Sequence, residues 1–106
     1  MSDPRMSYLM VMRVKGNPDD LRRVAGENGD KLQEISQRGK DAGAIHHAFF
    51  AGDGEALVVD EWDSPENFQK FFESEAPNIG PLMQAAGAQG EPEIKFYEKI
   101  DTADAF

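Results

Sequence analysis

Cysteine is absent from this chain of 106 residues. Without it there can be no disulfide bond, no thiolate metal ligand and no cysteine nucleophile. Long apolar runs are absent as well. The N-terminal stretch MSDPRMSYLMVMRV has only a short apolar part that contains Arg13, so it predicts neither a signal peptide nor a membrane span. We therefore expect a cytoplasmic protein.

Positive charge is also scarce. The chain has 11 Lys and Arg residues against 20 Asp and Glu residues, which gives a net charge of −9 and a pI near 4.5. A surface this acidic repels phosphate backbones and anionic lipid heads, so neither nucleic acid nor a membrane is an expected partner. The glycine-containing stretch GDGE is too short for a phosphate loop and does not precede a helix.

The apolar content and the length together suit one folded unit. Apolar residues make up 40% of the chain, enough for one core in a protein of this size. We expect a single domain over residues 1–106, with a loose leader at 1–6 and a polar tail at 101–106.

The first half of the chain predicts a strand and then a helix. YLMVMRVK, residues Tyr8–Lys15, is apolar on both faces, as in a strand that is covered on both sides. Asn17 can cap a helix and Pro18 suits its first turn, and we expect that helix to reach about Lys40. Its apolar stripe, with Asn28 in the same row, consists of Leu21, Val24, Ala25, Leu32 and Ile35.

Four glycines mark weak points in this helix. Gly26 and Gly29 each weaken it by about 1 kcal/mol relative to alanine, so a kink or break is expected between residues 26 and 30. Gly39 and Gly43 are candidate ends.

The second half predicts a hairpin, a helix and a last strand. Strands at residues 45–50 and 56–62 flank a turn at Asp53-Gly54. Ser64 and Pro65 begin a second helix, which we expect Pro77 and Gly80-Pro81 to break, leaving a short helical piece at 82–86. Residues 93–100 form the last predicted strand.

The element order is β-α-β-β-α-β, which predicts a ferredoxin-like α+β sandwich with a four-stranded antiparallel sheet. Helices can cover only one face of such a sheet. The other face would expose Phe50, Leu57 and Val59 or their neighbours, and an apolar face of that size needs a partner. The simplest partner is a second copy packed sheet to sheet, so we expect a homodimer that forms a dimeric α/β barrel.

The stretch VVDEWDSPENFQKFF, residues 58–72, follows a hairpin and opens the second helix. It resembles the dimeric α/β-barrel superfamily and, more narrowly, its antibiotic-biosynthesis-monooxygenase (ABM) branch. In that branch a third strand ending in Trp is followed by Ser and by an amphipathic helix rich in aromatics. The resemblance covers most of the chain as topology, whereas the local motif covers residues 58–72 alone.

This resemblance implies a function. The branch includes cofactor-free oxygenases that act on polyketide anthrones and quinols, and enzymes that degrade heme. In both groups the ligand lies between sheet and helices, facing a Trp that maps onto Trp62. The heme-degrading enzymes also carry an Asn on the first strand and a His on the second helix, and here Tyr8–Lys15 has no Asn and residues 65–86 have no His. The resemblance therefore implies a monooxygenase with no metal or flavin cofactor.

The hairpin turn allows the opposing residues to be counted. If Asp53-Gly54 is a two-residue turn, opposite residues have numbers that sum to 107, so His47 faces Asp60, His46 faces Glu61 and Ile45 faces Trp62. A three-residue turn with a bulge would shift this pairing by one. In the 107 register His47, Asp60 and Trp62 share one face, which the resemblance directs toward the helices.

A carboxylate beside an imidazole holds the ring in one tautomer and produces a general base for a phenolic or enolic proton. We hypothesise that His47 is the base, that Asp60 orients it, and that the Trp62 indole donates to a developing oxyanion. The expected ligand-binding residues are Asn28, Phe49, Phe68 and Phe72.

Each of these residues also has a structural interpretation. His47 and Asp60 can be a cross-strand polar pair, and Trp62 can be a core aromatic. Adjacent strand residues point to opposite faces, so His46 and His47 cannot chelate one metal ion. Three functions stay open: a cofactor-independent monooxygenase for a small aromatic or quinol-like molecule, a non-catalytic small-molecule-binding protein with the same pocket, and a dimerising interaction module whose core is filled.

Overall fold

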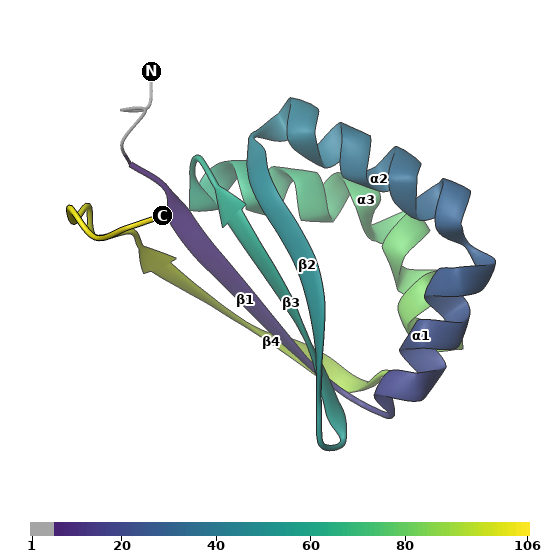
Figure 1. The fold of residues 1–106 in the computed structure, drawn as a ribbon. Coiled ribbons are helices and arrows are strands. Elements are labelled where there is room, and N and C mark those ends of the chain that lie inside the picture. The colour runs from purple at the N-terminus through teal and green to yellow at the C-terminus, as the bar shows by residue number, and fades with distance from the viewer. Residues whose placement is uncertain (1–5) are drawn as a thin grey trace.

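The computed structural model describes residues 6–106, so most of the predicted leader lies outside the described residues. The helices cover one face of a four-stranded sheet with the strand order β2-β3-β1-β4, in which every neighbouring pair is antiparallel (Figure 1). This is the predicted ferredoxin-like α+β fold. Its elements are β1 (Tyr8–Lys15), α1 (Pro18–Glu27), α2 (Gly29–Ala42), β2 (Ala44–Gly52), β3 (Glu55–Trp62), α3 (Pro65–Ala85) and β4 (Gln89–Glu98).

Side-chain caps begin the two long helical segments where the sequence predicts them. The Asn17 side chain accepts a hydrogen bond from the Asp19 N–H at 2.9 Å, and Pro18 follows as the first helical residue. The Ser64 hydroxyl accepts from the Asn67 N–H at 3.1 Å, with Pro65 next. Each cap satisfies a backbone donor that has no partner within its own helix.

The first helical segment breaks and ends at specific residues. The predicted break lies at Asn28, whose side-chain amide donates to the Val24 carbonyl at 2.7 Å and so ends α1. Gly43, with a positive φ of 125°, ends α2 before β2. Gly39 does not end the helix as predicted. It is buried inside α2, where a Cβ atom would lie 3.4 Å from the Phe71 ring, so glycine lets α2 and α3 approach closely.

The prediction that α3 breaks at its prolines is wrong. The helix continues through Pro77 and Pro81 to Ala85, and the piece expected at 82–86 forms its final turn. Each proline removes one intrahelical hydrogen bond, which is most costly when the freed carbonyl is buried. These two prolines are four residues apart on the exposed side of α3, so water can satisfy those carbonyls.

The β2–β3 hairpin has the predicted turn and nearly the predicted register. Asp53-Gly54 forms a two-residue turn with Gly54 at a positive φ of 69°, and the pairs from His46↔Glu61 to Gly52↔Glu55 all follow the 107 register. The register shifts at Ile45, so Ala44 rather than Ile45 lies opposite Trp62. A β-bulge of this kind places two residues of one strand opposite one residue of its neighbour, and Ile45 is the extra residue here. Strand β4 also begins earlier than predicted, at Gln89 instead of residue 93, and ends at Glu98.

The core lies between the sheet and the helices. Met10, Met12, Trp62 and Phe68 form its buried centre. The opposite face of the sheet is uncovered in the described chain, and on it apolar side chains alternate with charged ones such as Arg13, Glu61 and Lys95. We call this surface the outer sheet face; its members from the four strands include Leu9, Val11, Phe50, Leu57, Val59 and Tyr97.

Candidate functional site

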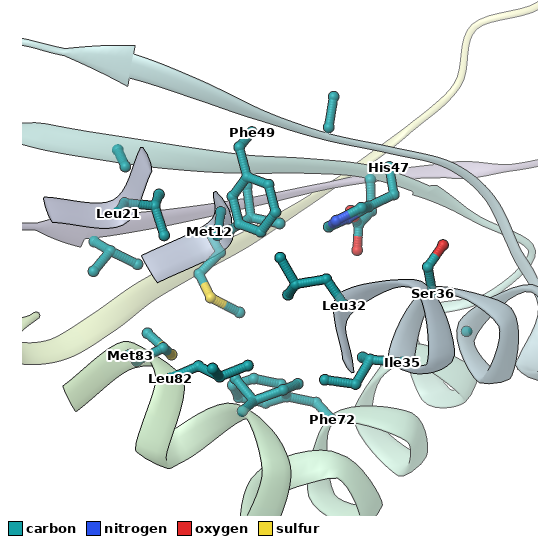
Figure 2. A pocket seen from close by; sticks show the side chains of 18 of the residues that line it. Met12, Leu21, Leu32, Ile35, Ser36, His47, Phe49, Phe72, Leu82 and Met83 are labelled. Atoms are coloured by element: carbon teal, nitrogen blue, oxygen red, sulfur yellow. The ribbon is translucent and has the colours of Figure 1, made fainter. Parts of the chain in front are cut away.

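A cavity of about 670 Å³ lies between the inner sheet face and the helices. In Figure 2 His47 and Phe49 point into it from β2, opposite Leu32, Ile35 and Ser36 of α2. Its floor comes from α3, with Phe72, Leu82 and Met83. This volume is within the range of small-molecule sites. An open cavity of this size argues against the interaction module with a filled core.

One polar cluster lies in the cavity wall at β2 and β3. His47 Nδ1 is 2.6 Å from Asp60 Oδ1, across the hairpin pair that the 107 register predicts. Asp60 is buried, whereas 42% of the His47 side chain is exposed. An ionised carboxylate can only accept, so Nδ1 carries the proton and Nε2 keeps a free lone pair in the neutral ring. The imidazole is therefore oriented and able to accept a proton from a ligand.

Trp62 extends this cluster in a way that corrects the predicted oxyanion role. Its Nε1–H donates to Asp60 Oδ2 at 3.0 Å, so the donor is already occupied within the protein. Only 1% of the residue is exposed, and its ring packs edge-on against Phe68 at 5.5 Å. Trp62 thus lines the cavity with its apolar ring while its N–H fixes Asp60, which in turn fixes His47.

No protein-family model matches the sequence, and no curated protein does. Solved structures do match. A monooxygenase from the gene ActVA-Orf6 of Streptomyces coelicolor, in complex with the ligand nanaomycin D, aligns with a TM-score of 0.66 at 16% identity over 98% of this chain and 96% of that chain. A dimeric ferredoxin-like protein from an uncultured marine organism aligns with a TM-score of 0.63 at 16% identity, over 94% and 98%. SnoaB, a cofactor-independent oxygenase from Streptomyces nogalater, aligns with a TM-score of 0.56 at 13% identity, over 94% of this chain and 97% of that chain.

The fold is that of the ABM-type monooxygenases. At identities this low the likeness establishes the fold alone, and it confirms the resemblance predicted from residues 58–72 to that extent. What this chain does within the ABM-type fold depends on its own cavity residues.

The predicted aromatic ligand contacts all line the cavity of this ABM-type fold. Phe68 and Phe72 stack with ring centroids 5.5 Å apart and an interplanar angle of 15°. Phe49 is 43% exposed at the edge strand and meets the His47 ring edge-on at 4.9 Å. Phe68 is 3% exposed and belongs to the buried centre of the core.

Asn28 does not belong to this group. It lies at the break between α1 and α2, its amide is bonded to the Val24 carbonyl, and it is not among the cavity-lining residues. Its place in the apolar stripe reflects the helix break, one of the local roles such a residue can have.

Sequence reasoning missed several cavity residues. Ile79, Leu82 and Met83 line the cavity because α3 continues through its prolines, and extending the helical period from Phe68 would have placed them there. Ser36 lines it as well, and the stripe Leu32–Ile35 already marks that side of α2 as the inner one.

An ion pair between a buried carboxylate and a half-exposed arginine joins α2 and α3. Arg38 of α2 holds Glu75 of α3 through Nε–Oε1 and through Nη2–Oε2 at 3.1 Å, and the Asn78 amide donates to the same carboxylate at 3.0 Å. Glu75 is only 4% exposed. Hydrogen bonding by Arg38, above all, holds the pKa of Glu75 below its ordinary value of 4.5.

Several other geometries bear on function. Across residues 6–106 no group of three or more His, Asp or Glu residues is placed to hold a metal ion. Nor does any helix in that range combine the length and apolar character that crossing a membrane requires. Arg13 and Tyr97 both lie on the outer sheet face, where Arg13 forms an ion pair with Glu55 and Tyr97 lies opposite Leu9.

Proposed function

We propose that this protein is a cofactor-independent monooxygenase for a small aromatic or quinol-like molecule bound between the sheet and the helices. The observation that carries the proposal is the His47–Asp60–Trp62 chain of hydrogen bonds, which presents an oriented imidazole to a mostly apolar cavity. The fold shared with cofactor-independent oxygenases supports it.

The proposed reaction needs only a base and an apolar site. His47 Nε2 removes a proton from an activated, hydroxylated ring, and the resulting carbanion gives electrons to O₂ and forms a C–O bond. For a ring carbon bearing two hydrogens, loss of both C–H bonds converts CH₂ to C=O and the second oxygen atom leaves as water. The four electrons that reduce O₂ come from the substrate, so the balance requires no other reductant.

The test is incorporation of labelled oxygen. We expect purified protein, incubated with a tricyclic anthrone under ¹⁸O₂, to give a ketone product heavier by one labelled atom and to consume oxygen in equal amount. Heat-denatured protein and the anthrone alone measure autoxidation and should be much slower. If native and denatured samples give the same rate for a panel of anthrones and naphthoquinols, the monooxygenase proposal fails.

Non-catalytic binding of the same kind of ligand is the second candidate. The observation that favours it is the occupied Trp62 N–H, because an oxyanion formed at His47 cannot use that donor. A binding protein would take up the anthrone stoichiometrically and return it unchanged, which the same experiment detects as ligand without label.

We also propose that two copies associate through the outer sheet face. Phe50 is 54% exposed and Tyr97 is 51% exposed, and the strand register places them on one face with Leu9, Leu57 and Val59. A second copy related by a two-fold axis buries this surface against the same surface of its partner. The match to a dimeric ferredoxin-like protein supports this arrangement.

Light scattering after size exclusion tests the dimer. We expect a mass of twice 11.7 kDa for the native chain and a shift to monomer for Phe50→Glu, because each interface would bury two new charges. Ala76→Glu, on the exposed side of α3, is the matched control and should stay dimeric. A native monomer at micromolar concentration would contradict the proposal.

A further inference from the structure

Ser36 carries a hydroxyl group that neither the fold nor the core requires. It is partly buried, it lines the cavity from the inner side of α2, and among residues 6–106 its side chain makes no hydrogen bond. The other serines of the described chain contrast with it: Ser7 donates to Glu61, Ser64 caps α3 and Ser74 donates to the Phe71 carbonyl. A partly buried hydroxyl without a partner in the protein is available to a ligand.

The chain geometry brings Ser36 level with His47. Helix α2 leads through Gly43 directly into β2, so both residues can be measured from that point. Seven residues of helix at about 1.5 Å each put Ser36 about 10 Å back along α2, and four strand residues at about 3.3 Å each put His47 about 13 Å along β2. Figure 2 shows both side chains toward the same end of the cavity, with Leu32 next to them.

This placement supplies what Trp62 cannot. With its N–H bonded to Asp60, Trp62 has no donor left for a ligand oxygen. We propose that the Ser36 hydroxyl donates a hydrogen bond to the ligand oxygen whose proton His47 Nε2 accepts, so that one ligand hydroxyl is held between α2 and β2. This inference rests on the proposed function, because it assigns the ligand contact of the same site.

The arrangement also defines the ligand class. The cavity lining consists mainly of methionine, phenylalanine and aliphatic side chains. Its polar members besides His47, Asp60 and Ser36 are Lys15, Asn17, Gln33, Lys40 and His46. A suitable ligand is therefore an apolar ring system with an ionisable hydroxyl at one end. That hydroxyl donates a hydrogen bond to His47 and accepts one from Ser36. The methyl ether of the same molecule keeps its apolar area but loses the donated bond to His47, and its oxygen is a poorer acceptor for Ser36.

Equilibrium dialysis with 1-naphthol and 1-methoxynaphthalene tests this inference. We expect native protein to prefer 1-naphthol, and Ser36→Ala to weaken 1-naphthol binding about fivefold while leaving the methyl ether unchanged, which is the loss of about one hydrogen bond. Ser36→Thr keeps the hydroxyl and should restore the preference. Ser74→Ala, outside the cavity, is the matched control and should bind both probes like the native protein.

The outcomes separate this inference from the proposed reaction. Equal binding of 1-naphthol by native protein and Ser36→Ala overturns the Ser36 contact, as does an equal loss for both probes, which would reflect shape rather than hydrogen bonding. Binding of neither probe by native protein overturns it too. In each case the monooxygenase proposal is tested separately by incorporation of ¹⁸O into the anthrone, because that measurement does not depend on Ser36 having this role.

Discussion

Replacing Asp60 by asparagine should lower the rate of oxygen uptake by about 10²- to 10⁴-fold, the range typical of a lost general base. The reason is the number of acceptors. Asp60 accepts from the His47 ring through Oδ1 and from the Trp62 indole through Oδ2. Asparagine keeps one oxygen and replaces the other with an NH₂ group, so it cannot satisfy both donors.

Either orientation of the new amide has a cost. If its oxygen stays with Trp62, the NH₂ group donates to His47 Nδ1, the proton moves to Nε2, and the ring can no longer accept a ligand proton. If its oxygen turns to His47, two donors face each other beside the buried indole, which costs about 1–3 kcal/mol of stability. The first orientation removes the base while keeping the fold, as in the wrong-tautomer variant of the serine protease triad.

Initial rates of oxygen consumption and urea unfolding of the same samples distinguish these outcomes. His47→Ala should lose a similar factor, and the double variant should be no slower than the slower single one, because the two residues act as a unit. Glu73→Gln, an exposed carboxylate on α3, is the control and should keep the native rate. A folded Asp60→Asn protein within threefold of the native rate would rule out the base assigned here.

The pairing of His47 with Asp60 was predictable because it depends on two local rules. A side-chain period of two fixes which residues of a strand share a face, and an Asp-Gly turn fixes which residues of two strands are opposite. Both rules act over a few residues and are insensitive to the rest of the protein. The structure follows them from His46 to the turn and departs at Ile45, where the chain must pass from Gly43 into the sheet.

The hydrogen bond of Trp62 was not predictable from the same rules. Residues 60 and 62 lie two apart on one strand face, so the pattern places both side chains near the cavity but leaves the indole rotamer open. In the structure the ring lies in the core with its N–H directed to Asp60. A buried indole needs an acceptor, and the nearest carboxylate on its own strand supplies one.

The prediction that α3 breaks is wrong for a related reason. Proline in a sequence predicts a helix break, but the cost of a proline inside a helix depends on whether water reaches the carbonyl that loses its hydrogen bond. One side of α3 lines the cavity with an apolar row that consists of Phe68, Phe72, Ile79 and Leu82. Pro77 and Pro81 therefore lie on the solvent-exposed side of the helix. Tertiary packing therefore decides the helix length, and with it the floor of the site.

Glu75 lies on the buried side of the same helix, which sequence reasoning did not predict. Its pairing with Arg38 gives the largest stability effect that we expect. Arg38→Ala should lower the free energy of unfolding at pH 7 more than the other two substitutions described here, because it leaves a buried carboxylate without its cation. Glu75→Gln should cost less, about 1–2 kcal/mol, since Arg38 is half exposed and can turn to water. Arg22→Ala, which breaks the exposed pair with Asp19, should cost less than about 0.5 kcal/mol.

The pH dependence of the unfolding free energy tests whether the charge of Arg38 causes this effect. The pKa of Glu75 is lowered in the folded state, so its ionisation stabilises the native protein above the ordinary value of 4.5, and this contribution disappears as the pH falls through the lower folded pKa. In Arg38→Ala the burial of Glu75 still raises the pKa while the main opposing contact is gone, so the carboxyl takes up a proton at higher pH than in the native protein. The gap between native and Arg38→Ala unfolding free energies should therefore narrow from pH 7 to pH 4, whereas for Arg22→Ala it should stay small at both. A gap that is constant across this range would mean that Arg38 contributes through packing of its aliphatic stem and not through its charge.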